Sequence, residues 1–450
     1  MNIIIIGGGK VGKTLTNHLL EEGHNITVIE KTKNILDLVV NTYDVAGVLG
    51  NGAVAKVQEE AGVNKADLFI AVTNDDELNL VCCKVARYLG AKKVIARVRD
   101  TEYTDQAELM RLGFGIDLIV NPELATAEEI ANLLRFPQAS SVHSFEKGKV
   151  VSVEIRLNED CSFIGQTVEE LVKGTSAELV IGSIVRDEKA IIPKGTDKFL
   201  DGDYVSFVSS PAKIDAFFKK VKVFNHRVKS CLIIGGSRIA YHLIRKLQDV
   251  GIKVKLIEKD ANRCNQILET MDKVEVINAD GTQKQVLDEE GLKDFDAVVS
   301  LTGMDEQNII ISLYAKSQNV DTVISKVNND TFDNILEDIN LDANISPKDI
   351  VANQIIKYTR TLNAKEEGSI ENIHKDIDAN LEVVELNIGE NDLVVGKAIK
   401  DMKIRENTII TSIIRGNEVI VPNGESVLES GDKIIISTTR TVDSLDSIIK

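Results

Sequence analysis

The sequence has no tryptophan and few of the residues that usually carry catalysis or metal binding: five cysteines and six histidines among 450 residues. An odd cysteine count, with no CxxC pair and no Cys/His cluster, argues against a disulfide framework and a zinc site. The histidines are scattered, and none lies with a carboxylate or cysteine at nucleophile spacing, so a general-base histidine is unsupported. We therefore expect reduced thiols, a cytoplasmic location and no metal.

Long apolar runs are also absent. No stretch approaches 18 apolar residues, so we expect no membrane-spanning segment. The first residues form a strand that runs directly into a glycine loop, so we expect no signal peptide. The apolar fraction of 43% and the charged fraction of 27% are those of an ordinary globular protein with two to four domains.

The charge balance is strongly acidic, with a net charge of −17. Such a chain repels phosphate backbones and anionic lipid, which disfavours binding to nucleic acid and direct insertion into a membrane. It favours docking to the cytoplasmic loops of a membrane protein, because those loops are rich in Lys and Arg. The alternative is that the acidity only aids solubility.

What the chain does contain is a duplication. IIIIGGGKVG at residues 3–12 matches CLIIGGSRIA at 231–240, and SIVRDEKAIIPKG at 183–195 matches SIIRGNEVIVPNG at 412–424. Glu30 matches Glu258 and Thr73 matches Thr302 between these segments. The spacing is constant apart from a shift of one residue, so each copy keeps a glycine loop and a β-rich tail.

The apolar pattern predicts the fold of each copy. Strand-length runs alternate with helix-length segments, which indicates a doubly wound parallel sheet. The runs in the first copy are Asn2–Ile6, Asn25–Ile29, Ala46–Leu49, Leu68–Val72, Val94–Val98 and Ile116–Val120. A further helix then begins at a proline, over Pro122–Arg135 and Pro347–Arg360, and short β-rich runs follow.

We therefore predict an α/β protein: two Rossmann-like parallel sheets, each followed by a small α+β module. The expected domains are residues 1–137, 138–224, 225–365 and 366–450.

The first glycine loop fits G-x-G-x-x-G, with a strand before it and an amphipathic helix after it. Gly7 permits the tight turn, Gly9 lets the backbone approach a pyrophosphate, and Gly12 allows the helix to pack closely on the strand. The helix N-terminus presents free N–H groups to phosphate. Glu30, 18 residues past Gly12 at the end of the second strand, would accept hydrogen bonds from ribose hydroxyls, which favours NAD or an adenine nucleotide over NADP. The alternative is a tight turn with no ligand.

Further polar residues follow the next strands. The Gly50–Ala53 turn would lie beside the adenine, and the segment that begins at Thr73 lies at the carboxyl edge, where open α/β sheets bind ligands. Thr73 is also a plausible N-cap for the next helix. Arg97 and Arg99 end the fifth strand, where one could reach a phosphate or an interface, or form a surface ion pair.

The loop of the second copy is degraded. Ser237 stands where a pyrophosphate needs the closest approach; its side chain adds a hydroxyl donor, and strain if its φ is positive. Ala240 is tolerated at the last position. We still favour a second nucleotide site, and its expected residues are Gly235, Ser237, Arg238, Ile239, Glu258, Asp280, Gly281 and Thr302. No Walker phosphate loop and no acid/base constellation accompany either copy.

These motifs together resemble the RCK family (regulator of potassium conductance, also called KTN). The glycine loop, Glu30 and the Thr73 segment are similar to its N-terminal half. Ser183, Arg186 and the Gly202-Asp203 turn, which recur at Ser412 and Gly431-Asp432, are similar to its C-terminal half. The order N–C–N–C over the whole chain resembles that of the Trk-type potassium-uptake regulatory subunits, the TrkA group.

The resemblance implies a non-catalytic peripheral subunit on the inner face of the cell membrane. It would form a homo-oligomeric ring, a dimer or tetramer, on a TrkH-like potassium-translocating subunit, and NAD(H), ATP or ADP would change the conformation of that ring. The family's ligand positions correspond to Gly7, Gly9, Lys10, Val11, Gly12, Glu30, Asn51, Gly52, Ala53, Thr73 and Arg97. Asn51 departs from the Asp common in the family.

Two other functions remain as alternatives. One is an NAD-dependent oxidoreductase, although a dehydrogenase would follow its cofactor fold with a substrate domain that carries an acid/base. The other is an RCK-type regulator of a different transporter.

Overall fold

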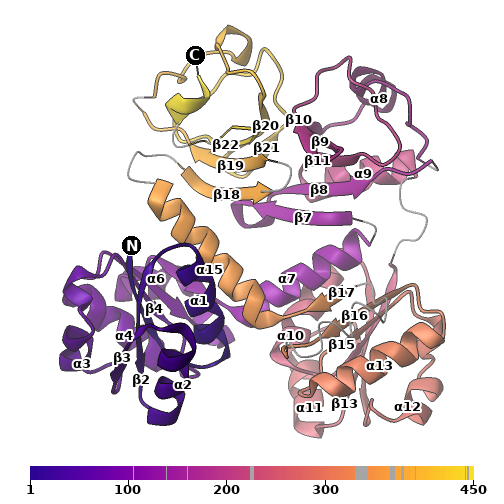
Figure 1. Cartoon of the computed structure of the whole chain (residues 1–450). Coiled ribbons are helices and arrows are strands. Elements are labelled where there is room, and N and C mark those ends of the chain that lie inside the picture. The colour runs from indigo at the N-terminus through magenta and orange to yellow at the C-terminus, as the bar shows by residue number, and fades with distance from the viewer. Residues whose placement is uncertain are drawn as a thin grey trace. The chain divides into compact units, whose positions relative to one another are not determined.

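Figure 1 shows the computed structural model of the chain, which contains two parallel and two antiparallel sheets. The described residues are 1–104, 106–137, 139–159, 161–222, 228–329, 343–364, 370–376, 380–390, 392–440, 442 and 445–449. They pack into two compact units. One is formed by residues 1–131 and 228–356, and the other by 132–227 and 357–450. Each unit therefore contains the equivalent parts of both copies.

The first parallel sheet has the strand order β3-β2-β1-β4-β5-β6. Its six strands coincide with the six apolar runs predicted from the sequence to within a few residues. They are β1 Asn2–Ile6, β2 Asn25–Glu30, β3 Ala46–Leu49, β4 Leu68–Ala71, β5 Lys93–Arg97 and β6 Leu118–Val120. The helices are α1 Lys10–Glu21, α2 Lys33–Tyr43, α3 Ala55–Glu60, α4 Asp76–Tyr88, α5 Thr101–Thr104, α6 Ala107–Phe114 and α7 Pro122–Arg135.

Strand β1 lies at the centre of this sheet because its neighbours pair with it on both sides. Ile5 pairs with Val28 of β2 and with Ile70 of β4, and all three side chains are buried. The strand order reverses at β1, so the carboxyl ends of β1 and β4 form the point at which open α/β sheets bind ligands.

The second parallel sheet repeats the first, with the order β14-β13-β12-β15-β16-β17. Its strands are β12 Ser230–Ile234, β13 Lys253–Glu258, β14 Val274–Asn278, β15 Ala297–Ser300, β16 Thr322–Lys326 and β17 Ala343–Ile345. The α-helices in its described part are α10 Arg238–Asp249, α11 Ala261–Thr270, α12 Lys284–Glu289, α13 Asp305–Ser317 and α15 Pro347–Ala364. The expected proline starts of α7 and α15 are confirmed.

The two β-rich tails are antiparallel five-stranded sheets of the same topology, β10-β9-β11-β8-β7 and β18-β19-β22-β20-β21. The first contains β7 Ala139–Phe145, β8 Val150–Arg156, β9 Val180–Arg186, β10 Lys189–Ile191 and β11 Tyr204–Ser209, with helices α8 Val168–Thr175 and α9 Pro211–Val221. The second contains β18 Ile370–Asp376, β19 Leu381–Asn387, β20 Thr408–Arg415, β21 Glu418–Ile420 and β22 Lys433–Thr438.

The two tails differ in their helices. Helix α8 begins with a capping box, in which the Thr167 hydroxyl accepts from the Glu170 N–H and the Glu170 carboxylate accepts from the Thr167 N–H. Ala398 stands at the equivalent bridge position of the second tail and provides no side-chain cap. The segment there shortens to the 3-10 turn Ile399–Asp401. Within residues 370–449, the described helical segments are 3-10 turns, so the second tail is mostly β.

The repeated Gly-Asp turn has a structural role. The Arg186 guanidinium donates Nε to Oδ1 of Asp203 over 2.7 Å and Nη2 to Oδ2 over 2.8 Å. Arg415 and Asp432 form the same bidentate pair in the second tail, at 2.8 Å for each bond. These pairs link the ends of β9 and β20 to the Gly-Asp turns that precede β11 and β22.

The four-part division of the chain stays a prediction in its details, because the expected boundaries fall on or beside residues outside the described part. No described helix is long and apolar enough to span a bilayer.

Candidate functional site

The turn between β1 and α1 requires two of its glycines. Gly7 has φ +102°, a conformation that side chains disfavour, and its N–H donates to the Ile29 carbonyl over 2.9 Å. A Cβ on Gly12 would lie 1.9 Å from the carbonyl oxygen of Gly7. The packing role predicted for Gly12 is therefore confirmed: α1 contacts the turn more closely than any side chain would permit.

Gly9 leaves the N-terminus of α1 open. It is the N-cap residue, with no side-chain cap, and a Cβ built on it meets nothing within 4 Å. Lys10 is exposed, whereas the Val11 side chain is buried in the core, so Val11 can offer a ligand only its backbone N–H. The helix thus presents unfilled space and uncapped donors at the place where phosphate binding is expected.

Glu30 lies directly beside this turn. Its Oε2 accepts from the Gly8 N–H over 2.8 Å, and its Oε1 accepts from the Thr32 N–H over 2.9 Å. The residue is only half-buried at the end of β2, and a carboxylate oxygen can accept more than one hydrogen bond. Acceptance from a ribose hydroxyl by this carboxylate stays a prediction.

The turn after β3 adjoins Glu30, because the Gly50 N–H donates to the Glu30 carbonyl over 3.0 Å. Asn51 Oδ1 accepts from the Ala53 N–H, which closes the turn. Gly52 packs under it: a Cβ there would meet Cγ2 of Ile6 at 2.6 Å. Gly52 has a packing role of its own, and binding of an adenine by this turn stays a prediction.

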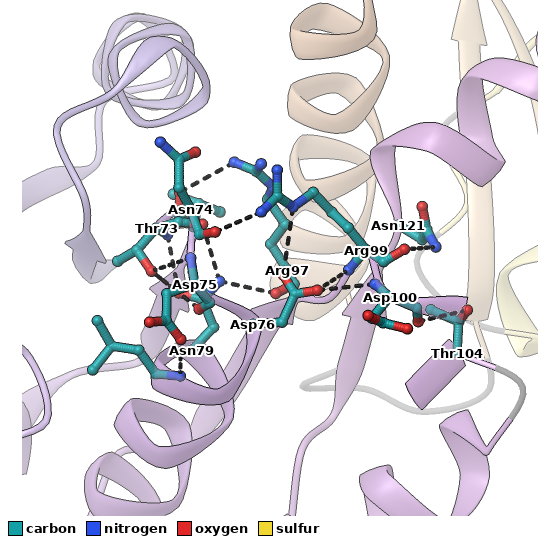
Figure 2. Close-up of polar contacts among 12 residues, drawn as sticks. Thr73, Asn74, Asp75, Asp76, Asn79, Arg97, Arg99, Asp100, Thr104 and Asn121 are labelled. Atoms are coloured by element: carbon teal, nitrogen blue, oxygen red, sulfur yellow. Dashed lines mark hydrogen bonds and ion pairs between the residues drawn. The ribbon is translucent and has the colours of Figure 1, made fainter. Parts of the chain in front are cut away.

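The carboxyl end of β4 carries a dense hydrogen-bond network (Figure 2). Asn79 Oδ1 accepts from the Thr73 N–H over 2.9 Å and from the Thr73 hydroxyl over 2.7 Å. Its Nδ2 donates to the carbonyl oxygens of Thr73 and Arg97. The N-cap of α4 is Asp75, whose carboxylate accepts from the Leu78 N–H, so the alternative reading of Thr73 as the cap is wrong.

Arg97, the last residue of β5, carries a buried cation. Only 8% of its surface is exposed, its Nε has no hydrogen-bond partner, and its Nη1 reaches the Val72 carbonyl at 3.5 Å. That carbonyl also lies 3.3 Å from the Cβ position of Gly7, so the guanidinium is close to the glycine turn. Burial lowers the pKa of Arg97 and neighbouring Arg99 lowers it further, whereas the Glu123 and Asp76 carboxylates raise it.

Arg99 is held differently, as Figure 2 shows. Its Nε lies 3.5 Å from Oδ1 of Asp76, and its Nη2 donates to the Asn74 carbonyl. Asp76 also accepts from the Arg99 and Asp100 N–H groups. Of the two sequence alternatives for this pair of arginines, Arg99 takes the ion pair, with Asp76, and binding of an anion by Arg97 stays a prediction.

Sequence reasoning missed Glu123 in the first turn of α7. Burial raises the pKa of its carboxyl group, while Arg99, Arg97 and Arg238 oppose that rise. Its Oε2 is buried without a hydrogen-bond partner. The proline at the start of α7 indicated that Glu123 would lie in the first turn of a helix, but only the fold places it beside Arg97. Arg238, from the second glycine loop, belongs to the same group of charges.

The second copy repeats the main backbone conformation and hydrogen bonds of the first. Gly235 has φ +102°, and Asn308 holds Thr302 as Asn79 holds Thr73. Glu258 accepts from the N–H groups of Gly236 and Asp260. Asp280 accepts from the Thr282 N–H and hydroxyl, which lowers its pKa.

Three other residues of the second loop are fixed by packing or conformation. Gly281 packs on Ile234, and the Ile239 side chain is buried. Ser237 has φ −69°, so the strain expected at a positive φ does not arise.

The structure therefore gathers the first-copy residues at one sheet edge: the glycine turn, Glu30, the Asn51–Ala53 turn, Thr73 and Arg97. The TrkA-N domain family matches residues 3–122 and 231–347, and the TrkA-C domain family matches 153–222 and 383–449. The chain belongs to the TrkA family. The resemblance found in the sequence is thus confirmed, including the alternation of N and C domains.

Full-length relatives of the TrkA family agree with this assignment. The chain is 32% identical over 97% of its length to the Trk system potassium uptake protein TrkA homolog of Archaeoglobus fulgidus, and the alignment covers 97% of that protein. It is 31% identical to the Trk system potassium uptake protein TrkA of Halomonas elongata, over 97% of this chain and 95% of the relative.

Solved structures share the fold. The crystal structure of the GsuK RCK domain aligns with 97% of this chain and 92% of its own, with a TM-score of 0.64 and 18% identity. The GsuK channel bound to NAD aligns with 97% of this chain and 76% of its own, with a TM-score of 0.63 and 18% identity. At this identity the likeness concerns the fold.

Proposed function

We propose that this protein is a nucleotide-sensing regulatory subunit of a potassium-uptake system. Its TrkA relatives carry the name of that system, and one RCK protein of the same fold has been solved with NAD and with ADP. In this proposal the chain assembles with further copies into a ring on the inner face of the membrane and controls ion flux through a TrkH-like subunit.

The observation that carries the proposal is the pairing of an open helix N-terminus with a buried, partner-poor arginine. The space beside Gly9 fits a phosphate, because a phosphate there would meet uncapped N–H groups of α1. Arg97 supplies a guanidinium whose Nε has no partner, and a guanidinium binds phosphate oxygens strongly. Glu30 would hold the ribose, and the Asn51–Ala53 turn the adenine.

A bound nucleotide would be sensed rather than transformed. In the described part of the crevice, both Glu30 oxygens accept backbone hydrogen bonds and the Thr73 hydroxyl donates to Asn79. Neither group is placed to move a proton on a substrate. Occupancy has a mechanical effect only if the ligand prefers one arrangement of the domains, so regulation requires different affinities for two states.

Thermal-shift titration of the full chain with NADH, NAD, ATP and ADP tests ligand binding. A ligand that binds only the folded protein raises the melting temperature with concentration. Co-purification with the membrane partner, followed by potassium flux in vesicles with each nucleotide, tests the regulatory role. Sustained NADH turnover with small carbonyl compounds in the absence of a partner would favour the oxidoreductase alternative and contradict the proposal.

A further inference from the structure

We infer that Ser237 makes the two crevices unequal, so that the first binds the diphosphate group of an adenine nucleotide and the second binds it at least about tenfold more weakly. This inference rests on the proposed function, since it concerns the ligand class of the same two sites. The duplication allows the comparison, because each residue of one crevice has a counterpart in the other.

Gly9 and Ser237 occupy the same backbone position. Their conformations are nearly identical, with φ −72° and ψ −167° for Gly9 and φ −69° and ψ 170° for Ser237. A Cβ therefore points in the same direction from both residues. At Gly9 that direction leads into free space, with no atom within 4 Å of the Cβ position. In the second copy, the Ser237 side chain fills the corresponding space.

Ser237 also uses the helix end that a phosphate would use. Its Oγ accepts from the Ala240 N–H at 3.4 Å, a long bond that still caps the N-terminus of α10. A diphosphate must displace this cap as well as avoid the Cβ. Loss of an N-cap interaction by itself corresponds to roughly a fivefold change in an equilibrium constant, and the steric conflict adds to it.

The cation at the end of the fifth strand also differs between the two crevices, and this difference again favours phosphate binding in the first. Lys326 stands where the first copy has Arg97, and its ammonium donates to the Thr302 carbonyl over 2.5 Å. The protein uses one donor of this ammonium, just as the Val72 carbonyl accepts from Nη1 of Arg97, but the Nε of Arg97 has no partner. A lysine also lacks the planar fork that lets arginine bind two phosphate oxygens at once.

The carboxylate of the second crevice is less accessible. Glu258 is only 6% exposed, whereas Glu30 is half-buried. Its Oε2 lies 3.1 Å from the Cβ position of Gly236, so the carboxylate lies closely over the loop. A ribose hydroxyl therefore has less access to Glu258 than to Glu30. The second crevice therefore differs from the first at three positions: Ser237 caps its helix end, its cation is a lysine, and its carboxylate is less exposed.

Isothermal titration calorimetry of the full chain with NADH and with ADP tests the inference. We expect one tight site per chain and a second site at least tenfold weaker. Ser237→Gly should strengthen binding at the second site by at least about fivefold, although Lys326 and Glu258 remain, and Gly9→Ser should weaken the first site by at least about tenfold. Ser237→Ala separates the two causes, because it removes the cap and keeps the Cβ.

Two equally tight sites in the unmodified chain would overturn this inference and leave the proposed function intact. The same conclusion follows if Ser237→Gly leaves the weak site unchanged in a chain that melts normally. Should Ser237→Gly fail to fold, Gly9→Ser decides, because its side chain enters free space: unaltered tight binding overturns the inference. Absence of any binding by the unmodified chain would overturn the proposed function itself.

Discussion

The Nδ2 of Asn79 donates to the main-chain carbonyl of Arg97 over 2.9 Å, and this bond joins helix α4 to the end of strand β5. The same side chain also binds Thr73 at the end of β4 (Figure 2). One buried amide thus fixes the carboxyl ends of two adjacent strands, on which Thr73 and Arg97 are positioned. Asn308 does the same in the second copy, with Thr302 and Lys326.

Removal of this amide should destabilise the fold. Asn79 is fully buried, so Asn79→Ala removes the hydrogen bonds to the Thr73 and Arg97 carbonyls and leaves the Thr73 N–H and hydroxyl without this acceptor. We expect a loss of about 3 kcal/mol in the free energy of unfolding, measured by urea denaturation. Asn74→Ala, at an exposed side chain of the same loop, is the matched control and should change stability by less than about 0.5 kcal/mol. Equal effects of both variants would contradict the assigned network.

The two glycines of the first loop should respond differently to alanine. Gly12→Ala places a Cβ on the Gly7 carbonyl, so stability should fall by about 2 kcal/mol or more, and nucleotide affinity should fall with it. Gly9→Ala meets no atom, so the melting temperature without ligand should stay within a few degrees while nucleotide affinity decreases. Comparable melting temperatures for the two variants would show that the turn is looser than the structure indicates.

Arg97 should contribute more to nucleotide affinity than to the stability of the ligand-free protein. Its guanidinium is buried with an unpartnered Nε, and such a group stabilises the fold little on its own. We expect Arg97→Met to leave the melting temperature without ligand unchanged or to raise it. The affinity for ADP, derived from the thermal shift, should fall by at least about tenfold. A lower melting temperature together with unchanged ADP affinity would assign Arg97 a structural role.

Glu123 should make stability depend on pH in a definite direction. Burial raises the pKa of this carboxyl group above its ordinary value of 4.5. The folded state therefore holds the proton over a range in which the unfolded state has lost it. Stability from this group falls as pH rises above 4.5 and through the raised pKa. Glu123→Gln should remove that loss.

The measurement is the urea midpoint of both proteins between about pH 4.5 and 7. We expect the urea midpoint of Glu123→Gln to increase relative to that of the original chain as pH rises. The control is Glu128→Gln, at an exposed carboxylate of the same helix. A constant difference between the Glu123→Gln variant and the original chain over this range would contradict the burial argument.

Much of the fold was predictable because local pattern and packing agree in this chain. The apolar runs around Ile5 and Ile70 gave the strands, and the turn of Gly7 and Gly12 gave the strand-to-helix connection. The Arg97 position was also predictable, since it ends a strand at the ligand edge. The binding roles themselves stay predictions.

Long-range relationships were not predictable in the same way. Nothing local places Glu123 beside Arg97, because their proximity depends on how α7 follows β6 next to β5. The sequence pattern also did not reveal that a 3-10 turn follows Ala398 where helix α8 follows Thr167 in the first tail. Whether Ser237 is strained depends on its φ angle, which is negative in the structure and cannot be read from the sequence.

The central claim is that the first glycine turn binds the diphosphate group of an adenine nucleotide. The most direct test is calorimetric titration of ADP and NADH into the full chain and into the Gly9→Asp variant. A carboxylate at this position would fill the open space and repel phosphate, so we predict saturable binding to the tight site in the original chain and its loss in the variant. Unchanged affinity at that site in a folded Gly9→Asp variant would contradict the account.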